Sequence, residues 1–596
     1  MERSGRWLGL GWVFALIGAP ALVQATTLYG VAGGGAFLVR FESAAPSVLT
    51  QVSVITGLQL GERIVDLDFR PGTGQLFGIG ITPGGGVIDS LRLYRLDALT
   101  GVATAVSQSG ILVTNGPAYD MDFNPTADRV RVVNAGNENL RLNPTTGARA
   151  DTPIIDTAIN PAGNFISGIA YDRSSGGPTS VTTLYGLSQT NNALVTIGGI
   201  DSSPSPNGGT VMNALPLGVD PTGDAGFDIG VDDTAYATLT VGGATGLYTI
   251  ALGTGAATLV GQIGDGNLPI PGLAVVPPTV LAIGADSGSP PLVRVLDGGS
   301  RAEIRSFLAF EPKTKGGVRV AVGDVTGDGV PEVIAATGTG AGPEIRVFDG
   351  VTGQQLGGAF ADFVPFDPKF KGGVYVAVGD VNADGLEDVI VAPGPGGTPH
   401  VKVYDGVSAP LDFAAYEESF KGGVQVASAD FDRDGRAEIV TAAGKGGAAR
   451  VRVFDALGAP FVSASLPGFV NAFAAYPPEK FKSEVFVAAG DVDGDGVPDI
   501  VTGAGKGAKP EVAVFSGANG ALLGRFLAFD AKQKKGVRVA VGDVDGDGRY
   551  DILASPGSAR GATVRAFDGR TLAQKAEFLA FDPKYRRGVF VAGVRR

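Results

Sequence analysis

The second half of the chain alternates apolar and polar residues in short runs. GVRVAVG (317–323), GVYVAVG (373–379) and EVFVAAG (484–490) place a β-branched or aromatic residue at nearly every second position. Each run is followed by an acidic segment and then by a second apolar run such as EVIAATG (332–338) or DIVTGAG (499–505). Alternation with a period of two over four to eight residues predicts half-buried β-strands. We therefore expect pairs of antiparallel strands joined by acidic loops.

Two further strands complete the unit. A third recurs six times as LVRVLDG, EIRVFDG, HVKVYDG, RVRVFDA, EVAVFSG and TVRAFDG. A fourth contains two spaced aromatic residues and also recurs six times: Phe307/Phe310, Phe363/Phe366, Phe413/Tyr416, Phe473/Tyr476, Phe526/Phe529 and Phe578/Phe581. Only five acidic segments occur, so the first unit (Thr279 to Phe310) lacks its first strand. We expect Gly588 to Ala592 to supply it, closing six blades by a 3+1 strand exchange that leaves no open sheet edge.

The five acidic segments share one sequence pattern: GDVTGDGVPE (323–332), GDVNADGLED (379–388), ADFDRDGRAE (429–438), GDVDGDGVPD (490–499) and GDVDGDGRYD (542–551). Counting from the first acid of each segment as position 1, oxygen-bearing side chains stand at positions 1, 3 and 5, Gly at 6 and a carboxylate at 9. Calcium prefers six to eight oxygen ligands, which alternating side chains on a tight turn can supply. An EF-hand loop would carry its acid at position 12, where these loops have none.

The candidate calcium ligands combine those side chains with the backbone carbonyl of position 7. Loop by loop they are Asp324, Thr326, Asp328, Val330 and Glu332; Asp380, Asn382, Asp384, Leu386 and Asp388; Asp430, Asp432, Asp434, Arg436 and Glu438; Asp491, Asp493, Asp495, Val497 and Asp499; and Asp543, Asp545, Asp547, Arg549 and Asp551. With these loops, residues 279–596 resemble the FG-GAP repeats of integrin α-type, VCBS-like β-propellers. The resemblance implies a β-propeller with about five structural Ca²⁺ ions, and it does not identify a ligand.

The first half carries a weaker repeat. Its inner strands are expected at IVDLDFRP (64–71), AYDMDFNP (118–125), GIAYDR (168–173), GFDIGVDD (226–233) and GLAVVPP (272–278). The pattern predicts a second all-β propeller over 26–277, with five blades or alternatively six, followed by the calcium-binding propeller over 278–596. The first half resembles an uncharacterised family of bacterial extracellular domains, which implies no activity.

Residues 1–25 have the features of a secretory signal: Arg3 and Arg6, an apolar run from Leu8 to Ile17, and Val23-Gln24-Ala25 before the expected cleavage point. An uncleaved N-terminal anchor is the alternative. The remaining sequence has no apolar stretch of membrane-spanning length. We therefore expect a secreted or cell-surface protein, in an extracellular or periplasmic location, with no transmembrane segment after cleavage.

Composition narrows the possible chemistry. The 596 residues include no Cys, which excludes disulfides, thiolate catalysis and Cys-based zinc sites. The formal net charge of −13 rises to about −3 once five Ca²⁺ ions are counted. Without a broad basic excess, nucleic acid is not an expected partner.

Basic residues gather in the connection between the fourth strand of one unit and the first strand of the next. They are Lys313, Lys315, Lys369, Lys371, Lys421, Lys480, Lys482, Lys532, Lys534, Lys535, Lys584, Arg586 and Arg587. In a four-stranded antiparallel blade these connections lie on the face opposite the calcium loops. One interpretation is a basic surface for an anionic polysaccharide or an acidic extracellular protein. The other is a set of solvated turns.

An extracellular binding or adhesion module is the function this pattern favours. The alternative is a glycan hydrolase or lyase that uses carboxylates such as Asp66, Asp68, Asp120 and Asp122, which alternate on expected inner strands. These residues could equally bond backbone amides. The single histidine, His400, begins a third strand and suits a surface position better than catalysis. A purely structural envelope component is a third possibility, and the oligomeric state is not predicted.

Overall fold

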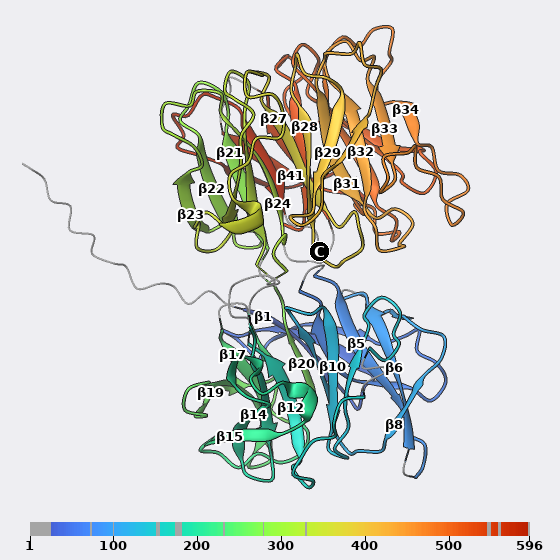
Figure 1. Cartoon of the computed structure of the whole chain (residues 1–596), viewed down its shortest axis with the longest axis vertical. Coiled ribbons are helices and arrows are strands. Elements are labelled where there is room, and N and C mark those ends of the chain that lie inside the picture. Colours follow the sequence, from blue (N-terminus) through green and yellow to red (C-terminus); the bar gives the residue numbers. More distant parts are fainter. Residues whose placement is uncertain are drawn as a thin grey trace, which may run out of the picture.

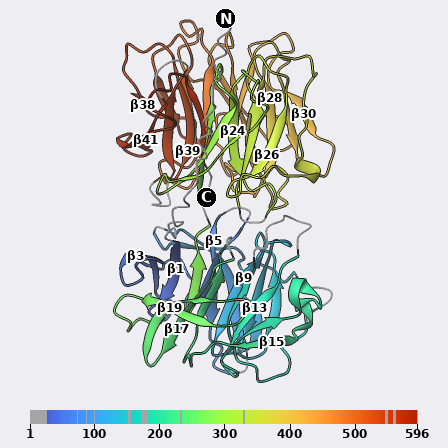
Figure 2. The same ribbon diagram turned by 90° about the vertical axis from the view of Figure 1, so that its left-hand side faces the viewer.

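The computed structural model describes residues 26–593, apart from 72–73, 87, 99, 151–154, 173–180, 231–232, 278, 328–329, 545–549 and 558–561. Its strands form two β-propellers, which Figures 1 and 2 show one above the other. The predicted tandem all-β fold is confirmed. The expected signal segment and the candidate ligands Asp328, Asp545, Asp547 and Arg549 lie outside the described residues.

The C-terminal propeller has six blades, as predicted. From the inner strand outwards, its sheets are β43 (Val589–Gly593), β21 (Val280–Ala285), β22 (Leu292–Asp297) and β23 (Glu303–Leu308); β24 (Val318–Gly323), β25 (Glu332–Thr337) and β26 (Ile345–Asp349); β27 (Val374–Gly379), β28 (Asp388–Pro393), β29 (His400–Tyr404) and β30 (Leu411–Ala414); β31 (Val424–Ala429), β32 (Glu438–Ala443), β33 (Arg450–Phe454) and β34 (Ala472–Ala474); β35 (Val485–Gly490), β36 (Asp499–Ala504), β37 (Glu511–Phe515) and β38 (Leu522–Leu527); and β39 (Val537–Gly542), β40 (Asp551–Pro556), β41 (Thr563–Asp568) and β42 (Gln574–Leu579).

The N-terminal propeller has five blades, so the six-blade alternative does not apply. Its sheets, again from the inner strand, are β20 (Gly272–Val275), β1 (Thr27–Ala32), β2 (Phe37–Glu42) and β3 (Leu49–Val54); β4 (Arg63–Phe69), β5 (Leu76–Thr82), β6 (Ile88–Leu96) and, both paired with β6, β7 (Ala103–Ala105) and β8 (Ile111–Thr114); β9 (Tyr119–Asn124), β10 (Arg129–Asn134) and β11 (Asn139–Leu142); β12 (Ile166–Tyr171), β13 (Leu184–Ser188), β14 (Ala193–Ile197) and β15 (Val211–Pro216); and β16 (Gly226–Ile229), β17 (Ala235–Val241), β18 (Ala244–Ile250) and β19 (Ala257–Gln262).

Both rings close by the same device. In the C-terminal propeller β43 pairs antiparallel with β21, with Gly593 opposite Leu281 and Val589 opposite Ala285. This is the predicted 3+1 exchange, shifted by one residue from the expected Gly588–Ala592. In the N-terminal propeller β20 pairs with β1. Each closing strand hydrogen-bonds an inner sheet edge that would otherwise be exposed.

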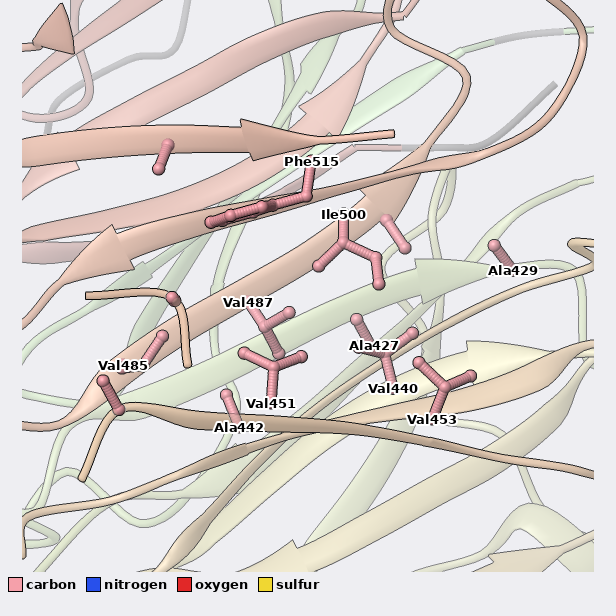
Figure 3. Close-up of a cluster of buried hydrophobic side chains, with 14 of the residues drawn as sticks. Ala427, Ala429, Val440, Ala442, Val451, Val453, Val485, Val487, Ile500 and Phe515 are labelled. Carbon is pink, nitrogen blue, oxygen red and sulfur yellow. The ribbon is translucent and has the colours of Figure 1, made fainter. Parts of the chain in front are cut away.

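Apolar side chains between the blades form the core. Figure 3 shows one such cluster, between the blades of β31–β34 and β35–β38, where Val440, Val453, Val487 and Phe515 pack together. Burying each such side chain stabilises the fold by about 1.5–3 kcal/mol. Strands such as β24 and β25 are buried at every position rather than half-buried as predicted, because the residues between the alternating apolar positions also pack against other blades or face the channel.

One blade departs from the expected pattern. The fourth strand predicted at Phe363 and Phe366 is reduced to an isolated bridge between Phe363 and Ile345. The glycine pair Gly357-Gly358 and a 3₁₀ turn, η4 (Gly358–Phe360), stand in its place. Two other 3₁₀ turns are η2 (Ile200–Ser202) and η3 (Pro206–Gly208). Among the described residues, no helix has the length and apolar character needed to cross a bilayer.

Candidate metal centres

Each acidic loop connects the first and second strands of one blade, as predicted. The loop after β35 begins at Asp491, directly beyond Gly490, and ends at Asp499, the first residue of β36. The position-9 carboxylate therefore lies on a strand, and it is buried in all five loops. The exposed fractions are 0% for Glu332, 2% for Asp388, 3% for Glu438, 0% for Asp499 and 1% for Asp551.

Three loops carry an acid at positions 1, 3 and 9, and in one of them Asp545 lies outside the described residues. In the other two loops these carboxylates converge. In each of the groups Asp430, Asp432, Glu438 and Asp491, Asp493, Asp499, carboxylate oxygens lie within 4.8 Å of one another. One oxygen of Asp430, Oδ1, is buried and has no hydrogen-bond partner among the described residues. Positions 1, 3 and 9 of the predicted ligand set are thus brought together.

Two other loops carry a neutral side chain at position 3, in the same arrangement. Asn382 Nδ2 lies 3.5 Å from Asp388 Oδ1, and Thr326 Oγ1 lies 3.5 Å from Glu332 Oε1. Both Asn and Thr offer an oxygen of the kind that Ca²⁺ binds. Positions 3 and 9 therefore meet in these loops as well.

Backbone amides hold the loop carboxylates in place. Gly496 N–H donates to Asp491 Oδ2 at 2.8 Å, and Val492 N–H donates to Asp499 Oδ2 at 3.2 Å. Gly496, at position 6, has φ 89°, in the left-handed region where glycine is favoured. The position-5 acid has a different partner: Asp495 Oδ1 accepts the N–H of Val497 at 2.8 Å. Position 5 thus shapes the turn in the described loops.

Burial and like charge raise the pKa of the clustered carboxyls. Loss of hydration is the main cause, and neighbouring loop carboxylates add to it in each case. The pKa of Asp388 rises to about 7, that of Glu438 to about 9 and that of Asp499 to about 7. Burial also raises the pKa of Asp380 and that of Asp430 to about 6. A bound cation would favour the ionised form of the same groups.

The loop of the sixth blade has an additional cationic neighbour. Lys575 Nζ lies 3.2 Å from Oδ1 of Asp551, the buried position-9 acid. Val544 N–H donates to Asp551 Oδ2 at 3.3 Å. An ammonium group therefore already neutralises part of the charge at this position.

The described parts of these loops lie on the face of the C-terminal propeller that is turned toward the N-terminal propeller (Figure 1), and a Cβ on Gly327 would lie 3.9 Å from the carbonyl oxygen of Pro125. Arg70 and Asp128, which form an ion pair of 2.5 Å in the N-terminal propeller, reach the loop at Gly385. A Cβ on Gly385 would lie 2.8 Å from Asp128 Oδ2 and 3.0 Å from Arg70 Nη2. We call this the calcium-loop face.

The opposite face carries the basic connections. The N–H of Gly340, between β25 and β26, donates to the carbonyl of Lys371, and Gly507 N–H donates likewise to Lys534. In each case the connection that leads into the first strand of one blade lies beside the connection between the second and third strands of the preceding blade. All the basic residues predicted there are exposed. We call this the basic face.

The candidate catalytic aspartates of the N-terminal propeller have structural partners. Asp66 and Asp68 on β4 accept the N–H groups of Met121 and Phe123 on β9, at 2.6 and 2.8 Å. Asp120 and Asp122 on β9 make the same bonds to Ile169 and Tyr171 on β12, at 2.7 and 2.8 Å. Their exposed fractions are 0–1%. We call these interblade carboxylate bonds.

One further interblade bond was not singled out from the sequence. Asp228 on β16 accepts the N–H of Val275 on β20, at 2.6 Å. Asp228 also lies with Asp68 and Asp122 in a buried group whose carboxylate oxygens are within 4.8 Å of one another. The sequence could have identified Asp228, because in the expected inner strand GFDIG it occupies a position equivalent to those of the aspartates in the other inner strands.

His400 has the surface position expected of it. It begins β29, and its Nδ1 and Nε2 lie 2.6 Å from Asp412 and 3.0 Å from Glu418. The hydrogen bond to Asp412 is the main cause that raises the pKa of His400. Both ring nitrogens are occupied by carboxylates, so the imidazole serves as an ion-pair partner.

Comparison with known families agrees with this division of the chain. Residues 380–441 match an FG-GAP-like repeat and residues 485–521 match an FG-GAP repeat, while residues 37–274 match a domain of unknown function, DUF4394. The C-terminal region therefore contains FG-GAP repeats, and the predicted resemblances of both halves are confirmed. No curated protein matches the chain.

Solved structures show only distant likeness. Raptor from Chaetomium thermophilum is 13% identical, with a TM-score of 0.32 over 50% of this chain and 23% of that chain. A chain of a nidogen/laminin complex is 10% identical, with a TM-score of 0.35 over 53% and 98%. U3-55K is 10% identical, with a TM-score of 0.28 over 72% and 94%. The aligned part therefore spans less than a quarter of the Raptor chain.

Proposed function

We propose that the loops of the C-terminal propeller hold about five Ca²⁺ ions, which stabilise the fold. The observation that supports this most directly is the convergence of buried carboxylate oxygens, within 4.8 Å, in the loops of Glu438 and Asp499. Like charges this close in a poorly hydrated site require either protons or a cation. The oxygen-only ligand set is typical of a hard cation such as Ca²⁺.

The stabilised propeller serves, in this proposal, as an extracellular binding or adhesion module. FG-GAP repeats are typical of extracellular proteins. The basic face is turned away from the N-terminal propeller, and its lysines and arginines are exposed. Its charge suits an anionic polysaccharide or an acidic surface of an extracellular protein.

Calcium titration of the chelator-treated chain 26–596 tests the first part. We expect about five sites by isothermal titration calorimetry and a higher melting temperature in calcium. Asp499→Asn keeps the hydrogen-bond acceptor and removes the charge, so it should lose one site. Asp362→Asn, at an exposed position outside the loops, should keep them all. Absence of calcium-dependent stabilisation would contradict the proposal.

Retention on an anionic polysaccharide tests the second part. Charge reversal of Lys534, Lys535, Arg586 and Arg587 together should weaken retention of the calcium-loaded chain on immobilised polygalacturonate and leave its melting temperature unchanged. Charge reversal of Arg63 on β4 and Arg305 on β23, which are exposed and lie outside the basic face, serves as a control. Equal retention of the reversed and the unmodified chain would remove the basic face from the binding proposal.

A further inference from the structure

The central channel of the C-terminal propeller has a ring of large side chains at one level. Every inner strand contributes its second residue to it. In order around the ring these residues are Phe590, Arg319, Tyr375, Gln425, Phe486 and Arg538. The neighbouring positions on the inner strands are mainly Val and Ala, so this ring is the polar and aromatic layer of an otherwise aliphatic channel.

These six residues line a cavity of about 120 Å³ that continues along the channel. Because one ordered water needs about 10–15 Å³, this volume accommodates a small polar group together with several waters. The ring lies near the start of each inner strand, which is the end on the basic face. A ligand would therefore reach it from the side that the N-terminal propeller leaves uncovered.

Arg319 is the most unusual member of the ring. Only 5% of this residue is exposed, yet its Nε and Nη1 have no hydrogen-bond acceptor among the described residues. Its Nη2 donates to Thr339 Oγ1 at 3.1 Å, and the guanidinium carbon lies 3.6 Å from the centroid of Tyr375. Buried donors are normally satisfied, because leaving them unpaired costs free energy. These unused donors border the cavity.

Arg538 provides a second cation on the other side of Phe590. Its guanidinium carbon lies 3.7 Å from that ring centroid, its Nη2 donates to Asp286 at 2.8 Å, and its Nε is likewise buried without an acceptor among the described residues. Glu484 influences Arg319 electrostatically without providing the missing acceptors. Asp286 hydrogen-bonds Arg538 and acts on Arg319 only electrostatically, so the Nε and Nη1 donors of Arg319 remain without an acceptor among the described residues.

We propose that this ring binds the carboxylate of a uronic acid residue in an anionic polysaccharide. The inference rests on the proposed polysaccharide partner and names the group that enters the channel. A carboxylate has only acceptors, and charge-assisted hydrogen bonds to guanidinium are the strong class. Phe486 and Phe590 provide apolar surface for the C–H groups of a sugar ring, and the exposed lysines of the basic face surround the entrance.

D-Galacturonate is the probe, with D-galactose as its uncharged counterpart and sodium chloride to match ionic strength. In calcium-loaded chain 26–596, we expect galacturonate to bind and to raise the melting temperature, and galactose to do neither. Arg319→Met should weaken galacturonate binding at least tenfold. Without the probe, Arg319→Met should melt at or above the temperature of the unmodified chain, because it removes an unpaired buried cation. Arg346→Met removes an arginine from the third strand β26, outside the channel, and should bind normally.

Three results would overturn the inference: no stabilisation by galacturonate, equal stabilisation by galactose, or an unchanged affinity in Arg319→Met. If Arg319→Met does not fold, Arg319→Lys keeps the charge with a different donor geometry and should still bind more weakly. N-Acetylglycine carries the carboxylate of a peptide C-terminus. If it binds more tightly than galacturonate, the ligand is a peptide and the uronic acid proposal is wrong.

The two proposals can fail separately. If polygalacturonate retention depends on the basic face but Arg319→Met leaves both retention and galacturonate affinity unchanged, the channel inference fails and the binding function stands. If galacturonate binds through Arg319 while the charge-reversed basic face retains polymer normally, the channel inference stands and the basic face is not needed for binding.

Discussion

The two propellers place their acidic residues at different points of the same strand. In the N-terminal propeller Asp66, Asp68, Asp120 and Asp122 lie within inner strands and bond the backbone of the next blade. In the C-terminal propeller the inner strands have no acid, and the acids follow directly after them. One arrangement connects neighbouring blades, whereas the other fixes the turn within a blade. Aspartate thus bonds the backbone of the next blade in one ring, whereas in the other, under our proposal, it makes stability depend on a bound cation.

Calcium removal should produce the largest difference in stability between the two propellers. A ligand at 100 times its Kd stabilises the folded state by about 2.7 kcal/mol per site. Chelation should therefore increase backbone hydrogen exchange widely in residues 280–593 and leave the interblade bonds of residues 64–171 protected. Mass spectrometry of peptides from the intact chain measures both halves at once. Equal loss of protection in both halves would show that they unfold as one unit.

Removing one interblade carboxylate should have an intermediate effect that calcium does not change. Asp66→Ala leaves the buried N–H of Met121 unpaired, which we expect to cost about 1–3 kcal/mol. Asp66→Asn keeps an acceptor oxygen and should cost much less. Urea unfolding, with hydrogen exchange in β4 and β9 to locate the change, compares the two variants. Equal destabilisation by Asn and Ala would argue against the hydrogen bond as the cause.

The pH dependence of stability should reverse with calcium in the C-terminal half. Burial raises the pKa of Asp388 to about 7 and of Glu438 to about 9, whereas unfolded carboxyls titrate near 4. Without calcium the folded state binds more protons across this interval, so stability should fall as pH rises from about 4 to about 9. With calcium, which competes with those protons, stability should rise or stay level.

The N-terminal half provides the comparison for that measurement. Burial raises the pKa of Asp66 and Asp120 well above the ordinary range, so its stability should also fall as pH rises above about 4. Calcium should not alter this slope. Melting curves across this pH range, with calcium or with chelator, provide the test. A calcium-dependent slope in the N-terminal transition would contradict the division between the two propellers.

The smallest expected effect concerns the loop of the sixth blade. Lys575 lies 3.2 Å from Asp551 and would compete with the proposed Ca²⁺ for that carboxylate. Lys575→Gln should increase calcium affinity at one site several-fold, since a partly exposed ion pair is worth about 0–1 kcal/mol. Lys445→Gln, an exposed lysine in another connection, serves as the matched control. An unchanged binding isotherm would show that Lys575 does not compete.

Much of this arrangement could be predicted from the sequence, because it depends on local periodicity. Alternation located the inner strands, and the mismatch between five acidic loops and six third strands predicted the pairing of β43 with β21. The partners of Asp66 and Asp120 were not predictable in the same way, because they are amides about 50 residues away whose position depends on how adjacent blades stack.

The channel ring is a second feature that local periodicity does not predict. Alternation identifies the second residue of each inner strand as inward-facing, but Arg319 and Arg538 are far apart in sequence. Both lie against Phe590 only once the ring has closed. The position of the calcium-loop face beside Arg70 and Asp128 depends in turn on how two complete propellers dock, which no local pattern specifies.

Strand exchange also sets an order for folding. Each ring is completed by a contact that spans its whole length, Leu28 with Val275 in one and Leu281 with Gly593 in the other. Contacts this distant in sequence form slowly, because a long loop must close first. Residues 27–275 are synthesised before 589–593, so the first ring can be complete while the second still exposes the edge of β21. During that interval the unfinished propeller is the part of the chain most prone to aggregate.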